Sequence, residues 1–564
     1  MRYIALATDY DGTLAHDGRV EKETIHALEG LRQSGRKLIL VTGRELDDLR
    51  RVFPRMELFE CVVAENGAVL YSPQTRQKRV LTEPPDAALV EALRKRGVQP
   101  LSIGDAIVAT WQPYETVVIE TIRELGLELH VVFNKGAVMI LPATVNKMTG
   151  LKAALESLQI SAHNVAGIGD AENDHAFLKR CEFSAAVANA LPALKQTADF
   201  TTQGDHGTGV AELVRMLIDD DLASHDPVRR AIEIGRDGDA KITIPAYGRS
   251  VLVAGGSGSG KSTFVAGLLE SLIEQRYQLC VIDPEGDYES FPGMITIGDE
   301  KHPASVHQIL QGLEKPSGQL VANFVGIPRQ DRPGFFTSLA PGLQELRLRN
   351  GRPHWIVIDE AHHMLPPEWA PGSAEVAVGL KNLVLITVHP DHVSPGALKA
   401  MDVVVAMGDQ ASNVIADFGK AADVAVPRAP KEEVPKGEAL VWRRGSKHVE
   451  LVRLIQSKAE HQRHQRKYAC GELGADNSFY FRGPDEKLNL RAQNLVTFLQ
   501  MAGGVDEDTW MYHLKRGDYS RWFREKIKDP ELAEEAAIIE RSGDAEDSRA
   551  RIREAIERHY TAPA

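Results

Sequence analysis

The chain has 564 residues, a formal net charge of -13 and 26% charged residues. This length allows about three or four domains of roughly 150 residues each, and the acidic balance argues against a general nucleic-acid coat. Four scattered cysteines without paired spacing argue against a disulfide scaffold: Cys61, Cys181, Cys280 and Cys470. Since the N-terminus lacks a signal-peptide pattern and no run of about 18 apolar residues follows, we expect a cytoplasmic protein with no membrane partner.

Two carboxylates follow the first predicted strand. The apolar run at residues 3–8 leads into Asp9-Tyr10-Asp11-Gly12-Thr13. Sheets in α/β proteins place their sites at the carboxyl ends of strands, and Mg²⁺ can hold a carboxylate beside a phosphate that would otherwise repel it. Asp9 is therefore a candidate nucleophile.

Three further motifs follow strand-like runs in the same region. Residues 37–41 precede Thr42-Gly43-Arg44, residues 137–141 precede Lys147, and residues 164–168 precede the segment from Gly169 to Asp174. An acidic turn explains the first motif alone, but four ordered motifs argue against that alternative.

This set of motifs resembles the haloacid dehalogenase superfamily, in the sugar-phosphatase-like branch whose cap lies between the second and third motifs. The resemblance implies that Asp9 forms an aspartyl-phosphate, while Asp11 protonates the leaving group and later activates water. It implies that Thr42 and Lys147 hold the phosphoryl oxygens. The implied Mg²⁺ ligands are Asp9, the backbone carbonyl of Asp11, Asp170 and Asp174.

Residues 1–222 are predicted to form this phosphatase domain, with an α+β cap at about 83–140. Trp111, Asn134 and Lys135 are candidates to face the leaving group, although a tryptophan is more often a core residue. Met148, where the branch often has Gly, and His175, at a usually apolar position, depart from the family pattern without removing a catalytic group.

A phosphate-binding loop lies at residues 250–263, SVLVAGGSGSGKST. An apolar run precedes it, and a helical pattern with one apolar face follows, a combination that a Gly/Ser-rich linker rarely shows. Glycines let the backbone wrap round phosphate oxygens, Lys261 can reach the β- and γ-phosphates, and Ser262 can ligate Mg²⁺. The expected ATP-binding residues are Gly255, Gly258, Gly260, Lys261, Ser262 and Thr263.

A second acidic pair, Asp359-Glu360, follows the apolar run 355–358. Beside a phosphate loop, Asp359 is expected to hold Mg²⁺ through water and Glu360 to polarise an attacking water. Further strand patterns alternate with helical ones, at residues 279–282, 320–325, 383–387, 403–407 and 439–442. Residues 228–455 are thus predicted to form a doubly wound, mainly parallel sheet.

This domain resembles the additional-strand ATPases of the HerA/FtsK type in GGSGSGKST, DPEGDY at 283–288, DEAHH at 359–363 and LITVHP at 385–390. The resemblance implies a ring hexamer that moves DNA. His389 is a candidate γ-phosphate sensor. Arg443 or Arg444 is a candidate arginine finger, and a solvated strand end is an equally good explanation of these two arginines. A kinase with Asp283 as its catalytic carboxylate is the runner-up.

Residues 456–564 are predicted to form a small helical region. The basic run 458–467, with His461, His464 and nearby Cys470, favours a solvated helix over a zinc site. Further helices are predicted at 488–501, from Trp510, and from Arg521 with Ser520 as N-cap, followed by an exposed helical tail from about residue 531. The two nearby tryptophans are expected to form the core of this unit.

The predicted fold class is therefore α/β, with two doubly wound parallel-sheet domains followed by a small helical region. The predicted function is a Mg²⁺-dependent phosphohydrolase acting on a phosphorylated small molecule or nucleotide, coupled to or regulated by an ATP-hydrolysing domain. The alternatives are a hexameric nucleic-acid motor with a nucleotide or DNA-end phosphatase head, a phosphatase-kinase, and a phosphatase regulated by a nucleotide-sensing module. A homo-oligomer is possible in each case.

Overall fold

The structure is a computed structural model, and it describes residues 1–134, 136–368, 380–429, 433–457, 468–469, 471, 473–541 and 544–560. The chain divides into two compact units. The first comprises Met1–Ala231 with the short segments Glu314–Pro316 and Glu345–Arg352, and the second comprises the rest of the chain.

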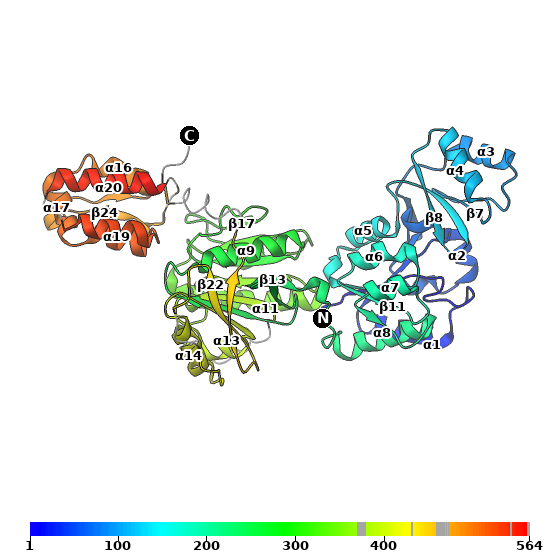
Figure 1. Ribbon diagram of the computed structural model, residues 1–564, viewed down its shortest axis with the longest axis horizontal. Coiled ribbons are helices and arrows are strands. Elements are labelled where there is room, and N and C mark those ends of the chain that lie inside the picture. The colour runs from blue at the N-terminus through cyan, green and yellow to red at the C-terminus, as the bar shows by residue number, and fades with distance from the viewer. Residues whose placement is uncertain are drawn as a thin grey trace. The chain divides into compact units, whose positions relative to one another are not determined.

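The first unit is built on a mostly parallel sheet (Figure 1). Its strands are β1 (Ala5–Thr8), β2 (Lys37–Val41), β3 (Cys61–Ala64), β4 (Val69–Ser72), β5 (Gln77–Val80), β10 (Val165–Gly169), β11 (Phe183–Ala186) and β12 (Phe200–Thr201). They lie in the order β12-β11-β10-β1-β2-β3-β4-β5, and β4 pairs antiparallel with both β3 and β5. The central strands are buried throughout, as expected where helices cover a parallel sheet.

The helices of this core follow the strands along the chain. They are α1 (Lys22–Gln33), α2 (Leu46–Val52), α5 (Lys147–Leu158), α6 (His175–Arg180), α7 (Pro192–Thr197) and α8 (His206–Asp220). The start of α5 is set by a capping box, in which the Asn146 side chain accepts the Thr149 N–H and the Thr149 hydroxyl accepts the Asn146 N–H. Lys147 is therefore held in the first turn of α5.

A separate antiparallel sheet forms the cap. Its strands are β6 (Ser102–Ile103), β7 (Val108–Trp111), β8 (Leu129–Asn134) and β9 (Ala137–Pro142), in the order β6-β7-β9-β8. Helices α3 (Ala87–Lys95) and α4 (Glu115–Glu124) cover its outer face, away from the core sheet (Figure 1). The run 137–141, predicted as a strand, is thus the β9 strand of the cap.

The second unit contains another large sheet. Its strands are β13 (Ile232–Asp237), β14 (Ala240–Ile244), β15 (Val251–Gly255), β16 (Leu279–Asp283), β17 (Ile295–Ile297), β18 (Leu320–Asn323), β19 (Trp355–Ile358), β20 (Leu383–Thr387), β21 (Val403–Met407), β22 (Glu438–Arg443) and β23 (Val449–Leu454). The order is β14-β13-β23-β22-β21-β15-β20-β19-β16-β18-β17, parallel from β21 to β17. The predicted fold class, with two parallel-sheet α/β domains, is confirmed.

The phosphate loop joins β15 to helix α9 (Lys261–Glu274), whose Phe264, Leu268 and Leu272 are buried as predicted. The other helices described around this sheet are α10 (Val306–Gly312), α11 (Arg332–Asn350), α13 (Pro395–Lys399) and α14 (Ala411–Ala422). The strands β17 and β23 were not predicted, because β17 is short and β23 has a largely exposed outer face.

The C-terminal region contains a short hairpin and a set of packed helices. These elements are β24 (Phe479–Phe481), β25 (Leu490–Ala492), α16 (Leu495–Ala502), α17 (Glu507–Lys515), α18 (Asp518–Glu525), α19 (Pro530–Ile539) and α20 (Ala545–Tyr560). Trp510 and Trp522 are buried in its core, as predicted, and the Trp510 indole donates to the Ser548 hydroxyl.

Three predictions for this region are wrong in detail. The helix expected at 488–501 begins at Leu495, because Asn494 caps it and residues 490–492 pair with β24. Helix α18 begins at Asp518 with Gly517 as N-cap, so Ser520 lies inside the helix. The tail is packed and not exposed, since α19 and α20 bury one apolar face each. The basic run 458–467 and Cys470 lie outside the described residues.

None of the helices described is both long and apolar enough to cross a membrane.

Candidate functional site

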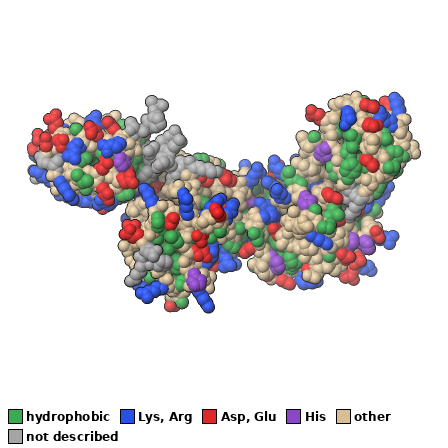
Figure 2. Space-filling model, in the orientation of Figure 1, with side chains coloured by type: hydrophobic (Ala, Val, Ile, Leu, Met, Phe, Trp, Pro, Cys, Tyr) green, Lys and Arg blue, Asp and Glu red, His purple; other side chains and the backbone are tan. Residues whose placement is uncertain are grey.

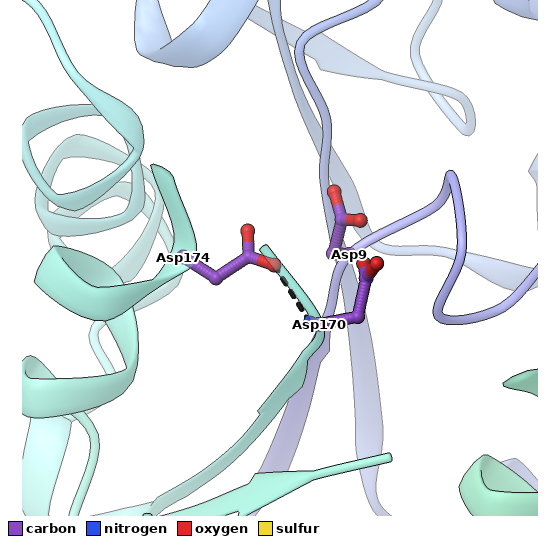
Figure 3. A group of neighbouring side chains, drawn as sticks. All are labelled: Asp9, Asp170 and Asp174. Atoms are coloured by element: carbon purple, nitrogen blue, oxygen red, sulfur yellow. Dashed lines mark hydrogen bonds between the residues drawn. The ribbon is translucent and has the colours of Figure 1, made fainter. Parts of the chain in front are cut away.

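Three aspartates from the carboxyl ends of two adjacent strands converge in the first unit. Asp9 follows β1, Asp170 follows β10, and Asp174 lies in the turn η4 (Glu172–Asp174) before α6. One carboxylate oxygen from each lies within 4.8 Å of the others, and all three side chains are buried. Figure 3 shows the three carboxylates turned toward one another. The strand order therefore brings together residues about 160 positions apart, as predicted.

Lys147 lies among these carboxylates. Its Nζ is 2.5 Å from Asp9 Oδ1 and 2.6 Å from Asp174 Oδ1, and the lysine is 1% exposed. Burial, followed by the charge of Asp174, raises the pKa of Asp9, and the Lys147 ammonium opposes this shift. One cation beside three buried carboxylates leaves an excess of negative charge.

Backbone and hydroxyl donors fix the second and third aspartates. Asp174 Oδ2 accepts the N–H groups of Asp170 and Ala171 at 2.8 and 2.9 Å, and the Thr13 hydroxyl donates to Asp170 Oδ1 at 2.8 Å. The Asp170 bond to Asp174 is the dashed line in Figure 3. These bonds leave Asp174 Oδ1 to accept from the Lys147 ammonium.

Asp11, the predicted acid-base residue, is held by Arg44, which was given no role from the sequence. The guanidinium of Arg44 donates to both Asp11 oxygens, at 2.6 and 2.7 Å, and also to Asp48 at 2.6 Å. Asp11 is half-buried, in contrast to Asp9. Its side chain is not among the three carboxylates that cluster in the described residues. Arg44 is thus a missed residue, although Thr42-Gly43-Arg44 already pointed to it.

Thr42 lies at the end of β2, fully buried, and its hydroxyl accepts the Arg44 N–H at 3.1 Å. Asn173, which lies in η4 beside Asp174, donates to Asn66 Oδ1 at 3.1 Å, while its own buried Oδ1 has no hydrogen-bond partner among the described residues. Neither Asn66 nor Asn173 was singled out from the sequence. Met148 packs against the core, and His175 contacts the Thr197 hydroxyl at 3.2 Å.

The three cap candidates have different outcomes. Trp111 ends β7 and is 53% exposed, so the expectation that it more often belongs to a core is wrong here. Asn134 ends β8, and its side chain is not among those described. Lys135 lies outside the described residues.

The phosphate loop has the geometry that its glycines predict. Gly258 and Gly260 have φ values of 76° and 95°, which favour glycine, and α9 begins directly at Lys261. Gly255 ends β15, where an added Cβ would come within 2.4 Å of the Met407 carbonyl. The Lys261 ammonium donates to the carbonyls of Gly255 and Gly256 at 2.7 and 2.9 Å. In the first turn of this helix, Ser262 is exposed and Thr263 is half-buried.

The acidic pair after β19 faces the same edge of the sheet. Asp359 is 7% exposed and accepts the Glu360 N–H at 2.9 Å, while Glu360 has a φ of 42° and a buried Oε2 without a hydrogen bond. Burial, followed by the charge of Glu285, raises the pKa of Glu360. Burial lowers the pKa of Lys261, and the negative charge of Glu360 opposes this shift. The two side chains therefore interact electrostatically.

The sheet order places one strand between the phosphate loop and the acidic pair. β20 pairs with β15 on one side and with β19 on the other, both in parallel. This is the additional strand that the predicted ATPase class requires. At the end of β20, Thr387 Oγ1 lies 3.3 Å from His362 Nδ1. The same hydroxyl donates to the His389 carbonyl at 3.1 Å, so His389 lies beside this edge of the sheet.

Other candidates have structural partners. Arg443 donates to Glu450 and to the Thr243 carbonyl, and Arg444 donates to the carbonyls of Lys399 and Met401. Because both guanidinium groups already have partners within the chain, a strand end without a catalytic role is favoured over an arginine finger. Asp283 is fully buried, and its two carboxylate oxygens accept four backbone N–H groups from residues 285–288. It is therefore poorly suited to the base of a kinase.

Two family models match parts of the chain. Residues 6–109 and 112–214 match the family described as haloacid dehalogenase-like hydrolase, and residues 232–324 match the family described as Helicase HerA, central domain. A phosphoglycolate phosphatase of Methanothermobacter thermautotrophicus is 34% identical over 223 residues, which cover 38% of this chain and 98% of the relative. Phosphoglycolate phosphatase 1 of Saccharolobus solfataricus is 28% identical over 229 residues, covering 37% of this chain and 93% of the relative.

The chain belongs to the haloacid dehalogenase-like hydrolases, with a HerA-type domain fused behind the hydrolase domain. It is thus a hydrolase of the phosphatase type joined to a domain of a P-loop ATPase class. Among solved structures, a haloacid dehalogenase-like hydrolase from Bacteroides thetaiotaomicron is similar with a TM-score of 0.34 and 19% identity, covering 38% of this chain and 99% of that one.

Proposed function

We propose that the chain is a Mg²⁺-dependent phosphatase that transfers the phosphoryl group to Asp9, fused to a domain that binds and hydrolyses ATP. The observation that carries the proposal is the cluster of Asp9, Asp170 and Asp174 around Lys147. We further propose the domain limits 1–222, 228–455 and 456–564, with the phosphatase first.

The residues present fit a divalent cation. Three buried carboxylates and one ammonium leave two uncompensated negative charges, and carboxylate oxygens are the ligands that Mg²⁺ prefers. Asp9, Asp170 and Asp174 would hold the ion, with the Asp11 carbonyl. Bound there, it supplies positive charge that screens the nucleophile from the phosphate dianion.

The chain's own residues divide the reaction into two displacements. A carboxylate oxygen of Asp9 forms a bond to phosphorus while the ester P–O bond breaks, and Asp11 gives a proton to the leaving oxygen. Asp11 then takes a proton from water as the water oxygen bonds to phosphorus and the Asp9–phosphorus bond breaks. Thr42 and Lys147 hold the equatorial oxygens. Arg44 donates to both Asp11 oxygens in this structure, so Asp11 has to leave one of these bonds before it can carry the proton.

The second site supports ATP hydrolysis. Gly255, Gly258, Gly260, Lys261, Ser262 and Thr263 form the phosphate loop. Lys261 and the N-terminus of α9 are proposed to bind the phosphates, Ser262 and Asp359 to hold Mg²⁺, and Glu360 to orient the attacking water. The position of Glu360, whose buried Oε2 accepts no hydrogen bond from the described residues and lies 3.4 Å from His362 Nδ1, and the intervening β20 support this assignment.

The first test measures phosphate release by the full chain from p-nitrophenyl phosphate, with Mg²⁺ and after chelation by EDTA. We expect release that EDTA abolishes and added Mg²⁺ restores, because the carboxylates repel the phosphate without the ion. A panel of 2-phosphoglycolate, sugar phosphates, nucleotides and phosphorylated oligonucleotides, with and without ATP, then addresses substrate and coupling. Release that is indifferent to EDTA would contradict the metal assignment.

A nucleic-acid motor is the second candidate, and the match to the HerA central domain favours it. In the view of Figure 2, basic and acidic side chains are interspersed over both units. DNA-stimulated ATP hydrolysis by a ring-sized particle in light scattering would support the motor. A monomer whose ATP turnover is unchanged by DNA would favour a nucleotide-sensing module instead.

A further inference from the structure

The two faces of the cap sheet have different partners. On one face, Val108, Val138 and Ile140 pack with the cap helices. On the other, Ala109, Val132 and Met139 pack against the core cluster of the phosphatase domain. Because side chains alternate along a strand, every second residue of β7, β8 and β9 faces the core domain.

Trp111 belongs to the face that turns toward the core domain. It lies two residues after Ala109 on β7, and its backbone partner Ala137 lies two residues before Met139 on β9. Its ring rests beside Gly136, where an added Cβ would be 3.8 Å from the indole. Trp111 is nevertheless 53% exposed, whereas Met139 on the same face is 5% exposed. The indole is therefore not needed to seat the cap on the core.

This face of the cap covers the catalytic strand ends. Met139 Sδ would lie 3.5 Å from a Cβ placed on Gly43, the residue after Thr42. Strand β8 packs against η4, which carries Asp174. Hence the sheet lies against two of the segments that hold the phosphoryl group and the metal cluster, and Trp111 extends the same surface outward.

We propose that Trp111 is a specificity-determining residue that stacks on a planar ring in the leaving group, so that the preferred substrates are nucleoside monophosphates. Trp111 lies on the strand next to that of Met139 and two residues further along, so its backbone is about 7 Å along and about 5 Å across the sheet from the residue that contacts Gly43. A two-carbon phosphorylated acid is too short to reach the indole, whereas a nucleoside monophosphate holds its base at such a distance from the phosphate. An exposed indole offers a large flat surface for such a ring. Figure 2 shows other hydrophobic side chains at the surface of the cap.

This inference rests on the proposed phosphatase, and its test separates the two. Values of kcat and KM are measured without ATP for AMP, dTMP, 2-phosphoglycolate and p-nitrophenyl phosphate, with wild type, Trp111→Ala, Trp111→Leu and Trp111→Phe. We expect AMP or dTMP to be the best substrate of wild type. The Ala and Leu variants should lose about tenfold or more in kcat/KM on nucleotides, mainly through KM, and less than about threefold on the two small substrates. The Phe variant should retain most of the nucleotide activity.

The matched control is Phe133→Ala. Phe133 is also exposed, at 45%, but it has the strand parity of Val131 and therefore lies on the opposite, helix-covered face of the cap sheet. We expect this variant to match wild type on all four substrates. A best kcat/KM with 2-phosphoglycolate, an equal loss on every substrate in the Leu variant, or unchanged nucleotide kinetics in both the Ala and Leu variants would overturn the role of Trp111. No release by wild type from p-nitrophenyl phosphate would instead refute the phosphatase itself.

Discussion

Replacing Asp9 with asparagine is expected to lower phosphate release from p-nitrophenyl phosphate by roughly 10⁴-fold or more, because the amide cannot form the bond to phosphorus. The substitution also removes one ligand of the carboxylate cluster and the 2.5 Å partner of Lys147. The measurement is kcat with saturating Mg²⁺, so that a weaker metal affinity is not mistaken for the loss of the nucleophile.

Asp17→Asn provides the control for this prediction. Asp17 lies eight residues further along the chain with a side chain that is 94% exposed, so the same chemical change there should leave kcat unaltered. ATP hydrolysis by the Asp9→Asn variant should also stay at the wild-type rate. A variant with Asn at position 9 that retains a tenth or more of wild-type phosphate release would rule out Asp9 as the nucleophile.

Lys261→Ala and Glu360→Gln are each expected to reduce ATP turnover by at least about a hundredfold, while phosphate release from p-nitrophenyl phosphate stays unchanged. The two losses should differ in origin. The Ala variant loses the ammonium that the phosphates attract, so its ATP affinity should fall. The Gln variant keeps the loop intact and should still bind ATP, because only the polarisation of water is removed.

The readouts are steady-state ATP hydrolysis and equilibrium binding of labelled ATP. Lys420→Ala is a suitable control, because Lys420 is 79% exposed on α14 and pairs only with a surface aspartate among the interactions seen in the structure. If both site variants hydrolyse ATP as fast as wild type, the second site is not an ATPase. Loss of phosphatase activity in the same variants would show that the two sites are coupled.

Much of the phosphatase domain could be predicted because its signals are local and ordered. β2 has the predicted bounds, Lys37–Val41, since an uninterrupted apolar run between polar residues defines a buried parallel strand. The convergence of Asp9, Asp170 and Asp174 followed from strand ends that meet at one edge of a sheet. In the second unit, the strands β19, β20 and β21 likewise have the predicted bounds.

Contacts between distant side chains could not be predicted in this way. The pairing of Arg44 with Asp11 joins residues 33 positions apart through a geometry that no spacing encodes. The exposure of Trp111, at 53%, also depends on how distant parts of the chain pack. The hairpin at 490–492 interrupted an amphipathic pattern because cross-strand pairing with β24 outweighed local helical periodicity. Asn494, two residues after the strand ends, then caps α16, which begins at Leu495.

The most direct test of the account is a search for phosphate covalently bound to Asp9. In the Asp11→Asn variant, p-nitrophenyl phosphate should still donate its phosphoryl group, because nitrophenolate leaves without a proton from an acid, but water is no longer activated. After mixing with Mg²⁺ and acid quenching, mass spectrometry should show one added phosphoryl group, located on the peptide that contains Asp9 and absent when Asp9 is also changed to Asn. An unmodified chain that nevertheless releases nitrophenolate, or a phosphoryl group on another residue, would contradict the proposed mechanism.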